Sequence, residues 1–388
     1  MHYLILADNY YPRPLANSIC LRSYADELKS AGHQCTIINR VDDGAKLKDT
    51  DNIYSFNCNK RPTYKAPFNT LYKVVRLFVY PHIYNRLVKA YADKIAEIDL
   101  SKVDVIVSVC NPIESVLAAL KVKEKYPDIK QVVYDVDTLS DFRLRQIERI
   151  CCPFWHKLAY KVEKVMFAQA DLTIVLSSHK GFYSGEKYKA FKNKLLFQEV
   201  PLLKIGDTAN VSDNGHCIYA GRFYKDFREP SVLLNLFKNT RLPLDIFTTK
   251  NYSNSIKKSS QTSGNINVSE YIPEEELNEV MKRSGILVSI GNKSSNMFPS
   301  KTVSYVAMCK PIIHIFHDDI DPVVDYLKDY PDVLFVDLRN SLAKNRALVS
   351  EFCSKEHPQI DAKEVAKRYE TSTPKYCTTE LLNRIKSF

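Results

Sequence analysis

The sequence predicts a two-domain α/β protein, and three observations carry that prediction. Short apolar runs alternate with helical patterns along both halves of the chain, as they do in α/β folds. A polar, irregular segment at residues 197–214 separates the two halves. The length of 388 residues is more than one ordinary hydrophobic core supports. We therefore expect two doubly wound domains joined near the middle of the chain.

The composition is that of a soluble globular protein whose partners are anionic. Hydrophobic residues make up 45% of the chain and charged residues 26%, and no apolar run is long enough to cross a bilayer. The N-terminus has neither the basic leader nor the long apolar run of a signal peptide. The ten cysteines show no metal-ligand spacing, which favours reduced thiols in the cytoplasm. The net charge of +10 favours phosphates, nucleotides, an acidic membrane surface or nucleic acid as partners.

The first half opens with a strand–helix–strand unit. Residues 3–7 are expected to form a buried strand, residues 17–30 a helix that Asn17 or Ser18 caps, and residues 35–39 a second strand. Ligands of such a domain bind at the carboxyl ends of its strands. A dinucleotide is not expected there, because the sequence has no GxGxxG. The side chains at that edge are those of Asn9, Tyr10, Arg13, Asn17 and Arg22.

Residues 60–94 have a distinct composition, in which lysine and arginine alternate with tyrosine, phenylalanine, leucine and valine, and acids are nearly absent. This pattern is typical of basic amphipathic helices, and two interpretations stay open. In the first interpretation, the segment lies on an anionic membrane or receives a lipid-linked acceptor. Alternatively, a helix pair packs its apolar side on the domain and leaves a basic face in solvent.

Three further strands are expected in the first half, at residues 103–109, 131–135 and 171–176, with helices between them. Polar residues follow these strands: Asn111 after the first, Asp135 and Asp137 after the second, and His179 after the third. The Asp-Val-Asp sequence is either a divalent-metal site or a structural or acceptor-binding feature, and so short a match is weak support for a metal. His179 is either an acceptor ligand or an ordinary polar loop residue.

The second half repeats the alternation, with strands expected at residues 217–222, 244–248, 265–268, 287–290, 312–316 and 332–336. The helix that begins at Pro299-Ser300-Lys301 is the most informative element of this half. Ser300 is its candidate N-cap, and Val303, Val306 and Ala307 form its apolar face. A hydroxyl and a cation beside the unpaired N–H groups of a helix start are typical of a phosphate site. An ordinary capped crossover helix is the alternative.

Four segments resemble glycosyltransferase family 4 (glycosyl transferases group 1), whose members have the GT-B fold. In chain order the segments are YYPRPLANSICLRSYADELKSAGHQCTII, KVEKVMFAQADLTIVLSS, CIYAGRFYKDF and LVSIGNKSSNMFPSKTVSYVAMCKPII. The resemblance implies an α/β GT-B protein, with two Rossmann-like domains and an interdomain cleft. It implies an acceptor-binding domain at residues 1–205, a nucleotide-sugar-binding domain at 206–365, and a C-terminal helix at 366–388 that packs back on the first domain.

The activity implied by the resemblance is a retaining, metal-independent transfer of sugar from a nucleotide-sugar to a saccharide or lipid-linked acceptor. Surface polysaccharide synthesis at the inner face of a membrane, without nucleic acid or cofactor, is the expected setting. Arg222 matches the family arginine on the donor pyrophosphate, Lys225 or else Arg228 its partner cation, and Lys301 a residue beside the nucleotide. The donor-binding set is then Gly221, Arg228, Gly291, Asn292, Asn296, Ser300, Ser304 and Tyr305. The acceptor-binding set is Asn9, Arg13, Asn17, Arg22, Asn111, Asp135, Asp137 and His179.

The chain also departs from the family pattern. Asn296 and Ser304 stand where members commonly have two glutamates, so the contacts to the sugar stay unassigned. An inactive GT-B-like partner subunit and a GT-B nucleotide-sugar epimerase are therefore the alternatives. Nucleic-acid binding is a poorer one, because no recognised module surrounds the basic stretch.

Overall fold

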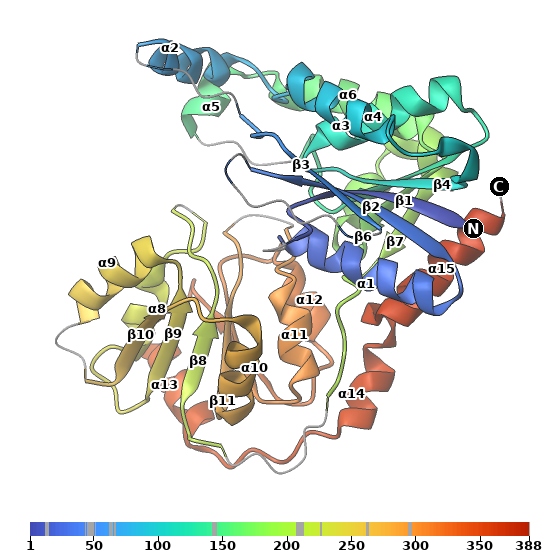
Figure 1. Ribbon diagram of the computed structural model, residues 1–388. Coiled ribbons are helices and arrows are strands. Elements are labelled where there is room, and N and C mark those ends of the chain that lie inside the picture. The colour runs from blue at the N-terminus through green and yellow to red at the C-terminus, as the bar shows by residue number, and fades with distance from the viewer. Residues whose placement is uncertain are drawn as a thin grey trace. The chain divides into compact units, whose positions relative to one another are not determined.

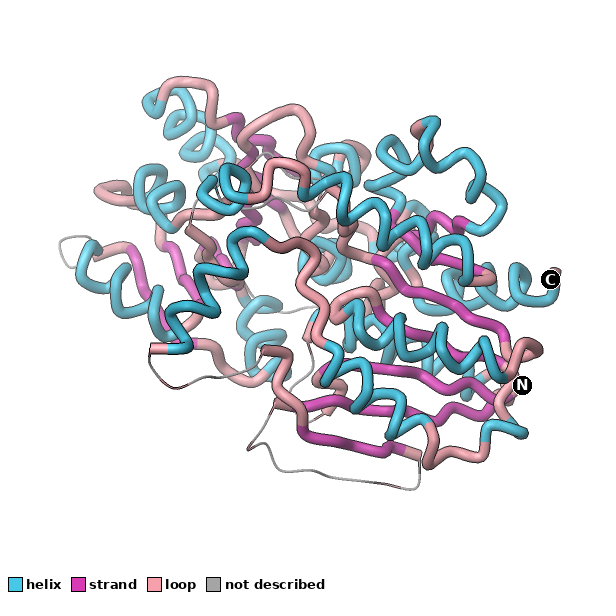
Figure 2. The backbone as a smooth tube through the Cα atoms, turned by 90° about the horizontal axis from the view of Figure 1, so that it is seen from above, coloured by secondary structure: helices cyan, strands magenta, loops and turns pink. Residues whose placement is uncertain are grey.

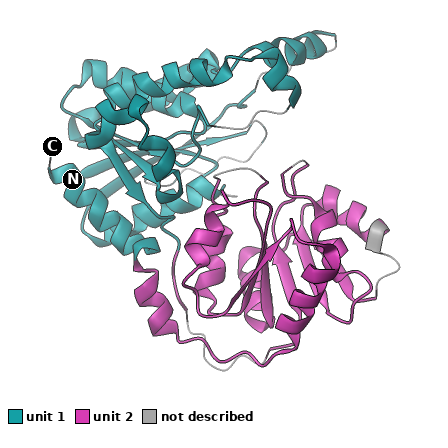
Figure 3. Ribbon diagram, turned by 180° about the vertical axis from the view of Figure 1, so that it is seen from behind, with its two compact units in different colours: residues 1–202, 371–388 teal, residues 203–370 magenta. Residues whose placement is uncertain are grey.

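The computed structural model separates into two compact units, Met1–Leu202 with Thr371–Phe388 (unit 1) and Leu203–Glu370 (unit 2) (Figure 3). It describes residues 1–11, 15–42, 44, 50, 52–61, 65, 67–141, 146–206, 213–225, 227–260, 264–293 and 297–387. The chain thus passes from one unit to the other at 202/203 and returns at 370/371, close to the predicted 205/206 and 365/366.

Unit 1 is built on a parallel sheet of seven strands in the order β3-β2-β1-β4-β5-β6-β7. The strands are β1 (His2–Asp8), β2 (Gln34–Val41), β3 (Ile53–Asn57), β4 (Val105–Val109), β5 (Lys130–Asp135), β6 (Leu172–Leu176) and β7 (Leu195–Gln198). The central strands are almost entirely buried, as the apolar runs predicted. The two edge strands, β3 and β7, were not predicted, and only the last two residues of β7, Phe197 and Gln198, fall in the segment where the linker was expected.

Helices cover both faces of this sheet (Figure 1). α3 (Asn85–Ile95), α4 (Ile113–Lys125) and α6 (Trp155–Gln169) pack over one face, and α1 (Ala16–Ser30) and α15 (Pro374–Lys386) lie on the other. Gln198 at the end of β7 connects the last two, because its side chain donates to the carbonyl oxygen of Cys377 (2.8 Å) and accepts from the hydroxyl of Tyr24 (2.6 Å). The C-terminal helix is therefore part of the first unit.

Unit 2 contains a parallel sheet of six strands in the order β10-β9-β8-β11-β12-β13. Figure 2 shows helices in cyan and strands in magenta. Its strands are β8 (Cys217–Ala220), β9 (Leu244–Thr248), β10 (Ile266–Glu270), β11 (Ile286–Ile290), β12 (Ile312–Phe316) and β13 (Val333–Asp337). Its helices are α8 (Pro230–Phe237), α9 (Lys250–Ser260), α10 (Glu274–Arg283), α11 (Lys301–Ala307), α12 (Pro322–Leu327), α13 (Leu342–Ser354) and α14 (Ala362–Arg368). Apolar side chains of the strands and of α8, α9 and α13 form one core.

The strand order decides where ligands can bind. In both units the chain starts at an inner strand, runs to one edge, and then returns to continue on the other side of that first strand. The reversal lies between β1 and β4 in unit 1 and between β8 and β11 in unit 2. In sheets of this kind, the loops that leave the strands on either side of such a reversal diverge and form the ligand site.

Two helix starts differ from the sequence prediction. α1 begins at Ala16 after Leu15, so Asn17 and Ser18 lie inside its first turn, where the Ser18 hydroxyl donates to the carbonyl oxygen of Asp8 (2.5 Å). Ser300 precedes α11 as predicted, but its backbone is already helical (φ −55°, ψ −26°) and its side chain makes no capping hydrogen bond. The expected Ser300 hydroxyl cap is therefore wrong.

No helix in the described parts of the chain combines the length and the apolar character that crossing a bilayer requires.

Candidate functional site

The candidate donor site of unit 2 consists of the loops that follow β8 and β11, at the reversal of its sheet. Arg228 joins these loops, because its guanidinium NH2 donates to the Asn292 side-chain oxygen (2.9 Å). A backbone bond from the Lys293 nitrogen to the Phe227 oxygen (2.9 Å) reinforces the junction. Arg228 was predicted as a donor-binding residue and as the substitute for Lys225. The structure places Arg228 between the two loops and Lys225 in an exposed turn.

Tyr305 of α11 holds the end of β8 in place. Its hydroxyl accepts a hydrogen bond from the Ala220 backbone nitrogen (3.1 Å), and its side chain is buried within α11. Burial raises the pKa of Tyr305 to about 12, so the hydroxyl stays protonated at neutral pH. The prediction that Tyr305 contacts the donor directly is corrected: its buried position makes it a support for the Gly221–Arg222 loop.

Arg222 and Lys301 are two exposed cations of this site. The Arg222 guanidinium lies 5.9 Å from the ring centre of Tyr224, and Lys301 is the first residue of α11. Desolvation lowers the pKa of Lys301, and the charge of Glu274 opposes that shift. Within the described residues, neither Arg222 nor Lys301 forms an ion pair with an acid, so both charges are available to an anionic ligand.

Two glycines of the site are required by close packing. A Cβ atom added at Gly221 would lie 2.7 Å from the Tyr219 hydroxyl, and one at Gly291 would lie 1.5 Å from Asp321 Oδ2. Asp321 is itself fixed, because it caps α12 through the Val323 nitrogen (2.9 Å) and faces the buried His314 ring (3.3 Å). The backbone at the ends of β8 and β11 is thereby kept free of side chains.

Replacing Gly291 with alanine is therefore expected to lower the free energy of unfolding by about 3 kcal/mol, because the buried Asp321 carboxylate has to move. Gly264→Ala is the matched control, since its Cβ would meet no atom within 4 Å. That control should change the free energy of unfolding by less than about 0.5 kcal/mol. Calorimetric unfolding of both variants measures the difference, and equal values would contradict the packing argument.

Other predicted donor residues are less informative. Ser304 is half-buried within α11, and Asn296 lies outside the described residues. Two residues that the sequence reasoning missed follow strands at the same edge: Tyr271 after β10 and His317 after β12. Burial raises the pKa of Tyr271, and the charge of Arg222 opposes that shift, so these two side chains are close enough to interact. Tyr271 was missed because it falls in no recognisable motif, whereas His317 was expected to be structural.

The candidate acceptor site of unit 1 lies at the reversal between β1 and β4. Asn9 follows β1 in the left-handed backbone region (φ 50°), and Asn111 follows β4 (φ 126°). The Asn111 side chain donates to Asp137 Oδ2 (3.2 Å), and burial raises the pKa of Asp137. Three of the predicted acceptor residues thus end adjacent or neighbouring strands at one edge of the sheet.

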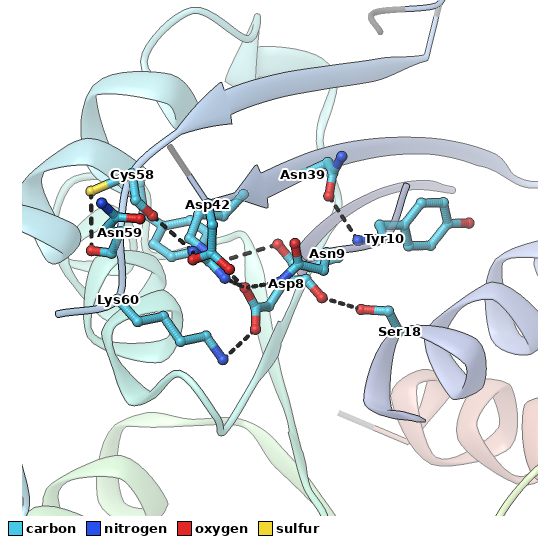
Figure 4. Close-up of polar contacts among 12 residues, drawn as sticks. Asp8, Asn9, Tyr10, Ser18, Asn39, Asp42, Cys58, Asn59 and Lys60 are labelled. Carbon is cyan, nitrogen blue, oxygen red and sulfur yellow. Dashed lines mark hydrogen bonds and ion pairs between the residues drawn. The ribbon is translucent and has the colours of Figure 1, made fainter. Parts of the chain in front are cut away.

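A buried ion network that the sequence reasoning missed lies below this edge (Figure 4). The fully buried Arg40 of β2 pairs with Asp8 at the end of β1, and it also donates to Asp42 (2.6 Å) and to the carbonyl oxygen of Cys58 (2.8 Å). Lys60 pairs with the second oxygen of Asp8. These bonds hold together the ends of the first three strands and the segment that follows β3.

The remaining acceptor predictions divide into surface and buried residues. Arg22 donates to the carbonyl oxygen of Tyr10 and lies over its ring (5.0 Å), while Asn17 is partly exposed and Arg13 lies outside the described residues. Asp135 and His179 are only 0% and 1% exposed, so the prediction that they contact an acceptor is corrected. Both side chains lie beneath the surface of unit 1, where a ligand does not contact them.

The burial of Asp135 also bears on the metal interpretation. Asp135 accepts a hydrogen bond from the Tyr183 hydroxyl (2.8 Å), and its pKa is raised well above the usual range, by burial first and by the neighbouring Glu163 second. Burial disfavours the charged form of this carboxyl. In the described part of the chain, no group of three or more His, Cys, Asp and Glu side chains is arranged to hold a metal ion.

Comparison with known proteins identifies the fold. No protein-family model and no curated protein sequence matches the chain. Among solved structures, it is similar to a glycosyltransferase from Rickettsia africae (15% identity, 100% of this chain and 98% of the other, TM-score 0.62). It is also similar to an α-glucosyltransferase in complex with UDP and DNA containing an HMU base (10% identity, 100% of this chain and 99% of the other, TM-score 0.63). A third similar structure is that of the lipopolysaccharide outer core galactosyltransferase WaaB (12% identity, 100% of this chain and 99% of the other, TM-score 0.56).

These similarities span the whole length of each chain, and they establish the two-domain α/β fold of GT-B type that the sequence predicted. Membership of family 4, and the roles of individual residues, stay predictions. At such low sequence identity the comparison identifies only the architecture. The function therefore has to be argued from the residues of this chain.

Proposed function

We propose that this protein is a glycosyltransferase that moves a sugar from a nucleotide-sugar held by unit 2 to an acceptor held by unit 1. One observation carries the proposal most. Arg222 and Lys301, which form no ion pair with the residues that the structure describes, and the bridging Arg228 lie at the loops around the reversal of the second sheet. That edge is the ligand-binding position of this fold. A leaving nucleoside diphosphate is the anion that such a set of cations suits.

The proposed chemistry needs little beyond positioning and charge. As the bond between the sugar and the diphosphate breaks, negative charge builds on the leaving oxygen, and fixed cations stabilise that charge. Arg222 and Lys301 would do this, with Arg228 as the second guanidinium in place of Lys225. We propose retention of the anomeric configuration, in which the departing phosphate takes the acceptor proton, so that neither a strong side-chain base nor a metal is required.

The nucleotide and the acceptor are proposed from the similar structures. The α-glucosyltransferase was solved with UDP and, in another complex, with UDP-glucose. We therefore propose a uridine diphosphate sugar as the first donor to test. WaaB is a lipopolysaccharide enzyme by its name, which supports a saccharide acceptor and a role in surface polysaccharide synthesis. DNA occurs in the α-glucosyltransferase complexes, so DNA is the competing acceptor class.

The test is turnover of the full-length chain with a set of nucleotide-sugars. Release of nucleoside diphosphate is measured with and without saccharide acceptors and DNA, and the anomeric configuration of the product is read by NMR. Release from one donor, with an α-product from an α-donor, supports the proposal. Nucleotide binding without release from any donor would instead favour the inactive partner subunit, which Ser304 and Asn296 make a real alternative.

One end of unit 1 supports a peripheral membrane location. α2 (Phe68–Val75) has no buried residue, and the 3₁₀ helix η1 (Arg76–Phe78) that follows it contacts α5 (Gln146–Cys151) (Figure 1). We call this surface the apolar end. Its large hydrophobic side chains, each at least 40% exposed, are Phe68, Leu71, Val74, Val75, Phe78, Val79, Ile147, Ile150, Phe154 and Leu158.

Such a patch is unusually large for a soluble protein surface. Lys73, Arg76, Arg149 and Lys157 lie in the same two segments, and Glu148 is the one acid between Gln146 and Leu158. Exposed apolar side chains among cations suit a bilayer that contains anionic lipids. α3, by contrast, buries Leu87, Val88 and Tyr91 against the sheet. The membrane interpretation of residues 60–94 is thus proposed for α2 and η1 only, now together with α5.

The protein is expected to float with vesicles of phosphatidylglycerol and phosphatidylcholine and to stay unbound with phosphatidylcholine alone. Phe78→Ser combined with Ile150→Ser should reduce the floating fraction several-fold, because both side chains are lost from the apolar end. The control pair is Ile320→Ser with Leu342→Ser, which are 49% and 45% exposed in unit 2. Equal flotation of the two double variants would refute the assignment.

A further inference from the structure

A cavity of about 230 Å³ opens in unit 1 at the carboxyl ends of β4 and β5. It lies beside Asn111 and Asp137, and two cis-proline peptides, Tyr80-Pro81 and Asn111-Pro112, form parts of its wall. Its cationic lining comes from the segment after β3 and from η1, whereas its polar and acidic lining comes from the strand ends and from Glu114 of α4. The cavity thus joins the basic segment to the predicted acceptor residues.

The cationic side consists of Lys60, Arg61 and Arg76. Lys60 pairs with Asp8, but Arg61 and Arg76 form no ion pair within the described residues. The Nε of Arg76 is buried and has no hydrogen-bond partner there, and its guanidinium lies 5.8 Å from the ring centre of Tyr72. A buried guanidinium nitrogen without an acceptor is costly unless a ligand supplies one.

His82 reports the charge imbalance in this cavity. The pKa of His82 is lowered to about 4, by burial first and then by the charges of Arg76 and Arg61, against the weaker effect of Glu148. The ring is therefore neutral at pH 7, and the positive charge around it is not compensated. An anion that bound between these arginines would stabilise a protonated His82 and raise its pKa.

Other lining residues of the cavity suit hydroxyl groups. Asn111 and Asp137 are hydrogen-bonded to each other (3.2 Å) and line the cavity together. Glu114, the other acid of the lining, accepts a hydrogen bond from the Tyr84 backbone nitrogen (2.8 Å), and burial raises its pKa. An amide and carboxyls of this kind are common partners of sugar hydroxyls.

We propose that this cavity binds a saccharide that carries a phosphate group, with Arg61 and Arg76 on the phosphate and Asn111 and Asp137 on the sugar hydroxyls. The inference rests on the proposed function and narrows its acceptor from any saccharide to a phosphorylated one. Two sources share this chemistry: a soluble sugar phosphate, and the diphosphate headgroup of a lipid-linked sugar. Arg76 belongs to both the cavity and η1, so a lipid-linked source would connect the cavity with the apolar end.

Calorimetric titration of the full chain, saturated with UDP to occupy unit 2, tests the proposal with glucose 1-phosphate, farnesyl diphosphate and glucose. The phosphorylated probes should bind and glucose should not. Arg61→Gln combined with Arg76→Gln should raise the dissociation constant about tenfold or more, because two charge-assisted hydrogen bonds are lost. Arg86→Gln, an exposed arginine of α3 outside the cavity, should leave that constant unchanged.

A measurement at His82 distinguishes binding in this cavity from binding elsewhere on the protein. In histidine-labelled protein, the NMR signal assigned through His82→Gln should show a raised pKa when a phosphorylated probe is bound. Tighter binding of glucose 1-phosphate indicates a soluble acceptor, and tighter binding of farnesyl diphosphate a lipid-linked one. Binding that is unchanged in the double variant, or a His82 signal that does not respond, would overturn the proposal. UDP binding in the same samples would still stand, so this failure is distinct from failure of the proposed function.

Discussion

Replacing Arg222 with alanine in the full-length chain is expected to slow release of nucleoside diphosphate from its donor about 10²- to 10³-fold. Arg222 has no acid partner among the described residues, and it stands at the carboxyl edge of β8, where the diphosphate is proposed to bind. Its charge is needed most when the leaving group gains negative charge, so the loss should appear mainly in kcat. Steady-state rates with the donor that the wild-type chain turns over measure the effect.

The control for this prediction is Arg283→Ala. Arg283 is an exposed arginine at the end of α10, on the amino side of β11 and so at the opposite edge of the same sheet. Its loss should leave the rate within a factor of about two. Lys301→Ala should resemble Arg222→Ala more than Arg283→Ala. If Arg222→Ala and Arg283→Ala turned over the donor equally fast, the assignment of the donor site would be wrong.

The second large effect is on stability: Arg40→Met should lower the free energy of unfolding of unit 1 by about 3–5 kcal/mol. The Arg40 side chain is 0% exposed and that of Asp8 3% exposed, so methionine would leave the Asp8 carboxylate buried with Lys60 as its remaining partner. The cost is that of a buried carboxylate that has lost its buried charge partner. Calorimetric or urea unfolding of the variant measures the loss.

Two further variants separate this explanation from simple loss of packing. Asp42→Ala removes the partner that is 63% exposed, and it should cost less than about 1 kcal/mol. Asp8→Leu combined with Arg40→Met removes both buried charges, and it should be more stable than Arg40→Met alone. If Asp8→Leu combined with Arg40→Met were less stable than Arg40→Met alone, the Arg40–Asp8 pair would stabilise unit 1 by more than the burial cost of its two charges.

Much of the fold could be predicted because parallel strands buried on both sides are continuous apolar runs. Residues 105–109 and 286–290 are of this kind, and the structure buries every one of them. β3 has the sequence IYSFN with a single buried residue, and β7 is an edge strand of four residues. Neither offers the long apolar run on which the prediction depended.

The site residues divide in the same way. Gly221, Arg222 and Asn292 were predicted from the resemblance of their segments to the family, and the structure places them just after β8 and β11. The partnership of Arg40 with Asp8 spans 32 residues, and an arginine inside a strand gives no sign that it is buried. Asp135 and Tyr305 were misjudged for the converse reason: polar residues near a strand end look accessible until the packing of the neighbouring helices is known.

The central claim is that unit 2 binds a nucleoside diphosphate through Arg222 and Lys301, and thermal unfolding with added nucleotides tests it most directly. UDP, GDP and CDP are each compared with their nucleosides and with the Arg222→Ala and Lys301→Ala variants. We predict that one diphosphate raises the unfolding temperature by several degrees, that its nucleoside does not, and that either variant loses the shift. An unchanged unfolding temperature with all three diphosphates, or an equal shift in both variants, would contradict the claim.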